Sequence, residues 1–140
     1  MPRPDAKLRN PFDFLAVRRE GRFVEMGAFR LNCRAFSARI SARVSQRFGI
    51  VASKHLVGDA VRRNRAKRVF RELLRMHAGK LPALCDVSVV VRRGYAKLSF
   101  EELSNRFAAA CNQLACYFEK HLPPSELAKE LSRNEKEKVH

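Results

Sequence analysis

The hydrophobic and polar positions between residues 58 and 79 follow the 3.6-residue period of an amphipathic helix. Stepping by about 100° per residue places six side chains on one apolar arc: Ala66, Val69, Phe70, Leu73, Leu74 and His77. Asp59 suits the N-cap, because its carboxylate can accept hydrogen bonds from the free N–H groups of the first turn. Gly79 suits a stop just beyond the last turn. The pattern therefore predicts a helix from about residue 60 to residue 78 with one packed face.

The opposite arc of this helix is cationic. It carries one amide and a row of cations: Asn64, Lys67, Arg68, Arg71 and Arg75, with Arg65 at its edge. Glu72 is the one acid among the seven Lys and Arg between residues 62 and 75. Opposite charges three or four residues apart stabilise a helix, whereas like charges cost roughly a few tenths of a kcal/mol each. A solvated face is the alternative, but a row of unbalanced cations favours an anionic partner.

The chain before this helix begins with a Pro-rich, basic stretch over residues 1–9, which we interpret as a flexible lead-in. Asn10 and Pro11 suit the N-cap and first position of a short helix that ends at Gly21. Phe12 and Phe14 lie two residues apart and cannot face the same core. We expect one of them to be more exposed, either packed on another part of the core or available to stack on an unpaired base.

Period-two alternation over residues 29–36 predicts a half-buried strand with Arg30 and Arg34 on its solvated face. A second strand is predicted over residues 47–53, and a short one near residues 23–26. A weak continuation over 38–44 suggests a hairpin connection somewhere within residues 37–46.

After the basic helix, the β-branched run over residues 86–92 predicts a central strand. A strand, a helix and a strand in succession indicate a crossover that joins two parallel strands. Ser99 and Glu102 form a capping box, and the helix that follows is expected to reach about residue 118. The sequence thus predicts one α+β domain over residues 10–120, with about four strands and three helices in α-β-β-β-α-β-α order. Residues 121–140 are expected to form a charged, disordered tail.

Composition adds a strong positive charge. The net charge is +15 and the pI is near 10.7, which points to nucleic acid or an anionic membrane surface. Residues 1–75 hold 19 Lys and Arg against 6 Asp and Glu, so the first half carries the binding surface. No apolar run approaches the ~18 residues of a membrane span, and no signal peptide is visible, so a cytoplasmic protein is expected. Charge spread over sheet and helix suits a structured RNA.

Catalytic chemistry is not evident in the sequence. The four histidines are scattered, and His77 on the apolar arc is expected to be a packed side chain. No carboxylate pair is placed for metal-assisted hydrolysis, and no Gly-rich phosphate loop occurs. The four cysteines lack metal-ligand spacing and are expected to be reduced thiols. We therefore predict no catalytic residue and no metal or cofactor bound by the protein itself.

Two adjoining segments resemble the protein subunit of bacterial ribonuclease P. They are the run Arg-Phe-Gly-Ile-Val-Ala-Ser-Lys at 47–54 and the run Val-Gly-Asp-Ala-Val-Arg-Arg-Asn-Arg-Ala-Lys-Arg-Val-Phe-Arg-Glu at 57–72. The similarity covers about residues 7–118. It implies a fold like the second domain of ribosomal protein S5, with a left-handed strand–helix–strand crossover against the general rule. It also implies a cytoplasmic holoenzyme in which a magnesium-dependent RNA subunit removes the 5′ leader from precursor tRNA.

The resemblance also implies roles for particular residues. The helix would bind the RNA subunit through Arg62, Arg63, Asn64, Arg65, Lys67, Arg68, Arg71 and Arg75. A cleft between the sheet and the first helix would hold the single-stranded leader, with Phe14, Arg18, Arg30, Arg34 and Lys54 as candidates. Arg18 and Asn32 stand where the family often has aromatic side chains, so this cleft is expected to depend more on charge and less on stacking.

The implied partners are the RNA subunit and precursor tRNA, with the protein monomeric in the holoenzyme. A structural ribosomal RNA-binding protein is the main alternative, since it would share size, charge and fold class. A free-standing metal-dependent nuclease is a weaker alternative, because the sequence has no carboxylate cluster.

Overall fold

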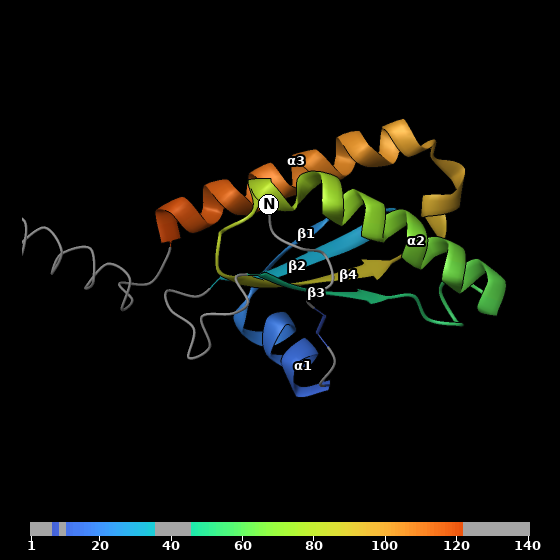
Figure 1. Cartoon of the computed structure of the whole chain (residues 1–140), viewed down its shortest axis with the longest axis horizontal. Helices are drawn as coiled ribbons and strands as arrows, with labels where there is room; N and C mark the ends of the chain where they lie inside the picture. The colour runs from blue at the N-terminus through green and yellow to red at the C-terminus, as the bar shows by residue number, and fades with distance from the viewer. Residues whose placement is uncertain (1–6, 9–10, 36–45, 122–140) are drawn as a thin grey trace, which may run out of the picture.

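The computed structural model describes residues 7–8, 11–35 and 46–121 (Figure 1). The main elements are α1 (Pro11–Glu20), β1 (Arg22–Glu25), β2 (Phe29–Ala35), β3 (Gln46–Val51), α2 (Ala60–His77), β4 (Cys85–Val91) and α3 (Phe100–His121). Short 3-10 turns, η1 (Ala78–Lys80) and η2 (Arg93–Lys97), flank β4. The predicted α+β class and the predicted element order are confirmed.

The four strands form one mixed sheet in the order β1-β2-β4-β3. β2 pairs antiparallel with both β1 and β4, whereas β3 and β4 are parallel neighbours joined through α2. The expected crossover unit is therefore confirmed, and the β-branched strand β4 is central. The left-handed sense of the crossover stays a prediction from the resemblance.

The sheet order corrects one expectation about the connection between β2 and β3. These strands are not neighbours, since β4 lies between them, so a hairpin joining them within residues 37–46 is wrong. The expected strand continuation over 38–44 falls outside the described residues. A hairpin does join β1 to β2, which are antiparallel neighbours. Its turn contains Gly27, which has a φ of +79°, and is closed by the Met26 N–H, which donates to the Phe29 carbonyl at 2.9 Å.

Part of the expected lead-in is packed against the sheet. Lys7 forms a parallel bridge to Phe48 of β3, and the Leu8 N–H donates to the Phe48 carbonyl at 2.8 Å. The Leu8 side chain is buried. At the other end, α3 extends to His121, three residues beyond the expected end, and the expected tail from residue 122 on lies outside the described residues.

α2 and α3 cover one face of the sheet, and α1 crosses the other (Figure 1). The inward side chains of the strands and the two helices build an aromatic centre between them. The Phe29 ring lies 5.5 Å from that of Phe70 on α2 and 5.4 Å from that of Phe107 on α3, centroid to centroid. All three rings are fully buried, so this side holds the hydrophobic core.

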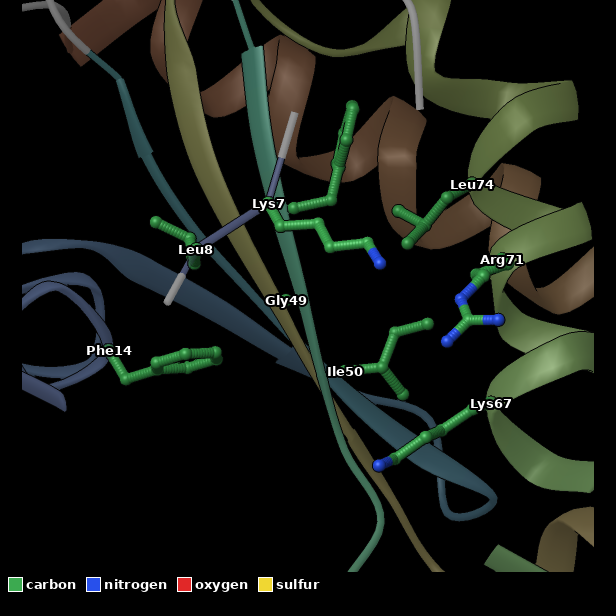
Figure 2. A pocket seen from close by; sticks show the side chains of 9 residues that line it. Lys7, Leu8, Phe14, Gly49, Ile50, Lys67, Arg71 and Leu74 are labelled. Carbon is green, nitrogen blue, oxygen red and sulfur yellow. The ribbon is translucent and has the colours of Figure 1, made fainter. Parts of the chain in front are cut away.

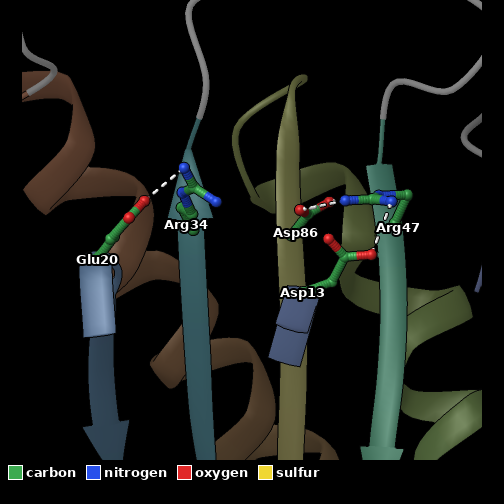
Figure 3. Close-up of polar contacts among 5 residues, drawn as sticks. All are labelled: Asp13, Glu20, Arg34, Arg47 and Asp86. Atoms are coloured by element: carbon green, nitrogen blue, oxygen red, sulfur yellow. Dashed lines mark hydrogen bonds and ion pairs between the residues drawn. The ribbon is translucent and has the colours of Figure 1, made fainter. Parts of the chain in front are cut away.

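The α1 side of the sheet is held by ion pairs (Figure 3). The Arg47 guanidinium donates two hydrogen bonds to the buried carboxylate of Asp86 on β4, with N–O distances of 2.9 Å and 2.7 Å. It also contacts Asp13 of α1 at 3.4 Å. The bond to Asp86 is the main cause that raises the pKa of Arg47. Near the other end of α1, Glu20 pairs with Arg34 of β2, so both ends of the helix are fixed to the sheet.

His77 is the packed histidine that the sequence predicts. Its Nε2 lies 2.8 Å from the Ser104 hydroxyl and its Nδ1 lies 2.7 Å from the Lys80 ammonium. Because an ammonium group can only donate, Nδ1 accepts and the ring proton sits on Nε2. Burial, and then the charge of Lys80, lower the pKa of His77 below 6.5.

This lowered pKa predicts a stability loss in acid. Above pH 6.5, the unperturbed value, His77 is neutral in both states. Below it the unfolded chain takes up a proton that the folded protein resists, so the free energy of unfolding should fall as the pH drops toward the folded pKa. Urea titrations between about pH 7.5 and pH 5.5 should show this loss. The His77→Gln variant should lack that component, and an identical pH dependence in both proteins would contradict the assignment.

Candidate nucleic-acid interface

α2 forms as its sequence pattern predicts. Asp59 has an extended backbone and its carboxylate accepts from the Arg62 N–H at 3.0 Å, which caps the helix. The predicted apolar arc is confirmed, because five of its members are buried in α2: Ala66, Phe70, Leu73, Leu74 and His77. Val69 is half-buried against the same core. The packed face fixes the rotation of the helix and turns the cationic arc outward.

The outward face of α2 carries many cationic side chains and few acidic ones. Most of its side chains are exposed and two are half-buried, and the sequence-predicted members are Arg62, Arg63, Asn64, Arg65, Lys67, Arg68 and Arg71. Within the described part of the chain, none of these cations forms an ion pair with a carboxylate. Arg75 differs, because its guanidinium pairs with Glu72 one turn earlier. The uncompensated charge is thus concentrated between residues 62 and 71.

A cavity of about 160 Å³ lies at the outer edge of β3, beside the point where Lys7 bridges to Phe48 (Figure 2). Phe14 of α1 lies on one side of the strand, and Ile50 of β3 faces Lys67 and Arg71 of α2 on the other. Lys7 adds a cation beside the strand. The cavity therefore joins the cationic face of α2 to the α1 side of the sheet, and it combines an aromatic ring with three cations.

Phe14 packs directly over Gly49 of β3. A Cβ at position 49 would overlap the Phe14 ring, so the glycine provides the space in which the ring lies. Phe14 is half-buried as a result, whereas Phe12 is 77% exposed. The expectation that the two differ is confirmed, but the more exposed ring is Phe12. Phe14, which the resemblance assigns to the leader cleft, lines the wall of the 160 Å³ cavity.

The remaining leader-cleft candidates separate into two groups. Arg30 and Arg34 of β2 lie on the α1 side of the sheet, and Arg34 is already paired with Glu20. Arg18 is an exposed side chain near the end of α1. Lys54 follows β3 and does not join them; it lines a different cavity near the start of α2.

Asn32 occupies a polar position in the middle of the α1 side. It is buried, and its Nδ2 donates to the Ser88 hydroxyl of β4 at 3.3 Å. The Asn32 amide therefore bonds within the sheet and places no aromatic ring on this face.

The second cavity, of about 500 Å³, is strongly basic. It lies between the segment after β3, the first turns of α2 and η2, and its charged lining residues are Lys54, Arg62, Arg65 and Arg93. The Arg93 guanidinium donates to the His55 carbonyl at 3.0 Å, which ties η2 to the segment that precedes α2. Sequence reasoning missed Arg93, because it follows β4 in a short turn that has no periodic pattern.

The described residues offer no obvious site for redox or metal chemistry. The cysteines are free thiols: Cys33, Cys85 and Cys111 are buried and Cys116 is exposed. Burial raises the pKa of Cys111 to about 12, which makes it a poor nucleophile. Across residues 7–8, 11–35 and 46–121, no group of three or more His, Cys, Asp or Glu could hold a metal ion. Of the described helices, none is long and apolar enough to cross a membrane.

Comparison with known proteins gives a consistent result. The family model Ribonuclease P matches residues 1–115. The ribonuclease P protein component of Syntrophobacter fumaroxidans is 37% identical over 108 residues, covering 76% of this chain and 86% of the relative. That of Geobacter sp. (strain M21) is 34% identical over 115 residues, covering 81% and 90%.

Solved structures show the same likeness. The RNase P protein from Thermotoga maritima superposes with a TM-score of 0.63 at 26% identity, covering 76% of this chain and 96% of that one. The RNase P protein of Staphylococcus aureus gives a TM-score of 0.61 at 23% identity, covering 75% of this chain and 91% of that one, and supports the fold.

Proposed function

Because the chain belongs to the ribonuclease P protein family, we propose that it is the protein subunit of a ribonuclease P holoenzyme that removes the 5′ leader from precursor tRNA. A role in RNA binding and tRNA processing follows from the family. The finer proposal assigns magnesium-dependent cleavage to the RNA subunit and binding to the protein. The observation that carries it is the uncompensated cationic face of α2, placed beside a cavity that holds an aromatic ring.

The RNA subunit is proposed to bind across α2 and the 500 Å³ cavity. Arg65 lines that cavity and also belongs to the cationic face of α2, so the two surfaces are continuous. Arginine suits phosphate binding, because its planar fork presents several donors and keeps its charge. Arg93 extends the surface beyond α2 and is proposed as an additional phosphate contact.

The leader is proposed to lie along the cavity at the edge of β3. Single-stranded RNA is bound by combining cations for the backbone with aromatic rings for the bases. Phe14 offers the ring on one side of β3, Lys67 and Arg71 offer cations on the other side, and Lys7 adds a cation beside the strand (Figure 2). The protein is proposed to work as a monomer in the cytoplasm, as its family resemblance implies.

The Phe14→Ala substitution should affect leader recognition specifically. Loss of a stacking ring should weaken holoenzyme binding to precursor tRNA by roughly 1–3 kcal/mol, and it should leave binding to the RNA subunit unchanged. Fluorescence titrations with precursor and mature tRNA measure the difference. Equal losses for precursor tRNA and for the RNA subunit would count against a leader cleft.

Gly49→Ala provides a matched control for this prediction. The added methyl displaces the Phe14 ring, so it should reproduce much of the leader defect. In the Phe14→Ala background there is no ring to displace, and the second substitution should add little. Additive effects would mean that the ring does not act through its position over Gly49.

Competition separates this function from that of a ribosomal protein. The labelled full chain is bound to the RNA subunit and challenged with excess ribosomal RNA. A ribonuclease P subunit should stay with the RNA subunit and should not co-sediment with ribosomal subunits. Transfer to ribosomal RNA would favour the alternative.

A further inference from the structure

Phe23 of β1 is an aromatic side chain that the proposed leader cleft does not use. It is 50% exposed. The strand register pairs Phe23 with Asn32, Asn32 with Ser88, and Ser88 with Gly49. Because side chains at paired positions share a face, these four residues form one row across the α1 side of the sheet, with the Phe14 ring over its far end. Strands lie ~4.8 Å apart, so roughly 14 Å separates the two ends of the row.

Arg30 of β2 lies against this ring. Its guanidinium carbon is 3.7 Å from the centre of the Phe23 ring, a cation–π contact that holds the two side chains together. No carboxylate within the described part of the chain pairs with Arg30, and its Nε is buried without a hydrogen-bond partner. The neighbouring acid, Glu25, is paired with Arg92 at 2.9 Å. The buried Nε cannot reach a ligand, but the terminal Nη groups of Arg30 have no carboxylate partner among the described residues and can donate beside the exposed ring.

The position of Phe23 and Arg30 in this row suits the binding of a nucleotide. Phe23 lies directly opposite Asn32 on the next strand, so its ring stands on the α1 side of the sheet, the same side as the Phe14 ring. A flat ring backed by an unpaired guanidinium complements the two parts of a nucleotide, a base that stacks and a phosphate that accepts hydrogen bonds.

We propose that Phe23 and Arg30 form a second nucleotide-binding point for single-stranded RNA, separated from Phe14 by the width of the sheet. A base stacks on the exposed part of the Phe23–Arg30 pair, and Arg30 donates to the adjoining phosphate. This inference rests on the proposed leader cleft and extends it from the β3 edge to the β1 edge. Asn32 and Ser88, in the middle of the row, are buried, so the RNA is proposed to contact the two ends of the row and not its centre.

Tryptophan fluorescence tests the proposal on the full chain, which contains no Trp. In Phe23→Trp the new indole is the single tryptophan of the protein. When a short oligouridylate is added, stacking of a base on this indole should quench its fluorescence, and the quenching should saturate. Phe14→Trp reports on the proposed cleft in the same way. Phe100→Trp is the matched control, because Phe100 is 43% exposed but lies at the start of α3, on the other side of the sheet.

The expected result is quenching of the indoles at positions 23 and 14 with a common apparent Kd, and little change at position 100. Quenching at position 14 without quenching at position 23 overturns this inference and leaves the leader cleft standing. Quenching at neither position overturns the proposed leader cleft together with the inference.

Substitutions that remove the pair supply a second, independent readout. Phe23→Ala should weaken oligouridylate binding roughly 5- to 150-fold. Arg30→Gln should weaken it and lower the slope of log Kd against log salt by about 0.7, the value for one phosphate contact to a single strand. Thermal melts should confirm that both variants stay folded. Unchanged affinity in a folded Phe23→Ala protein contradicts the proposal.

Discussion

Replacing Arg65 and Arg68 together by alanine is expected to weaken binding of the RNA subunit by roughly 2–6 kcal/mol, since each good arginine contact is worth about 1–3 kcal/mol. Both side chains are exposed on the outward face of α2 and have no carboxylate partner among the described residues. Their removal costs the fold little, because exposed positions away from caps and cores tolerate substitution. Binding should also become less sensitive to salt, as fewer counterions are released. Filter binding at several salt concentrations measures both effects.

Arg75→Ala is the matched control on the same helix. Its guanidinium is compensated by Glu72, so it attracts phosphate less and its loss should weaken binding less than the loss of either Arg65 or Arg68. If Arg75→Ala matched the double variant, the distinction between compensated and uncompensated cations would be wrong. If the double variant bound normally, the assignment of α2 to the RNA subunit would be wrong.

Arg47→Ala is expected to lower the free energy of unfolding by about 2–4 kcal/mol, because it removes the two hydrogen bonds and the charge that the guanidinium supplies to a buried carboxylate. Asp86 has an exposed side-chain fraction of 1%, and Arg47 also joins Asp13 of α1 to β4. The loss should therefore loosen the docking of α1 as well as the sheet. Urea denaturation of the wild type and the variant measures the difference.

Arg92→Ala tests whether burial is the reason for this loss. Arg92 also forms an ion pair, with Glu25, but both side chains are more than a third exposed. Exposed pairs contribute about 0–1 kcal/mol, so this variant should remain close to the wild type. In the Arg47→Ala background, Asp86→Asn should recover part of the stability by removing the buried charge. Similar losses for Arg47→Ala and Arg92→Ala would contradict the account.

The basic helix could be predicted almost completely from the sequence, because its determinants are local. The period of the apolar arc, the Asp59 cap and the nearly acid-free opposite face all lie within about twenty residues. The structure adds that Glu72 compensates Arg75. That pair was within reach of sequence reasoning, since residues three apart are neighbours on a helix.

The sheet order and the cavity walls depend on long-range pairing, which no local pattern encodes. β4 inserts between β2 and β3 from more than thirty residues away, so a hairpin was a reasonable but incorrect expectation. The spacing of Phe12 and Phe14 showed that they face different ways. Phe14 is the ring that packs on the sheet because Gly49 leaves room for it, and because Arg47 holds the intervening Asp13 to the sheet.

Arg93, Leu8 and Phe23 were missed for a related reason. Each is a single side chain in a turn, a short extended segment or a four-residue strand, where too few positions exist for a period to appear. Their partners, His55, Phe48 and Arg30, come from other parts of the fold. The cationic face of α2 could be predicted because side chains on one face of a helix recur at a regular spacing in the sequence. The surface around it is built from residues that are distant in the sequence, so no local pattern predicts it.

The proposed role of this chain in ribonuclease P is tested by 5′ processing of a precursor tRNA at low magnesium. Three samples are compared: the RNA subunit from the same source, the full-length protein, and the two together. We expect cleavage at the mature 5′ end in the mixture and none by the protein alone. Cleavage by the protein alone would reveal a catalytic site that the described residues do not suggest. No gain in the mixture would contradict the assignment of this chain as the protein subunit of ribonuclease P.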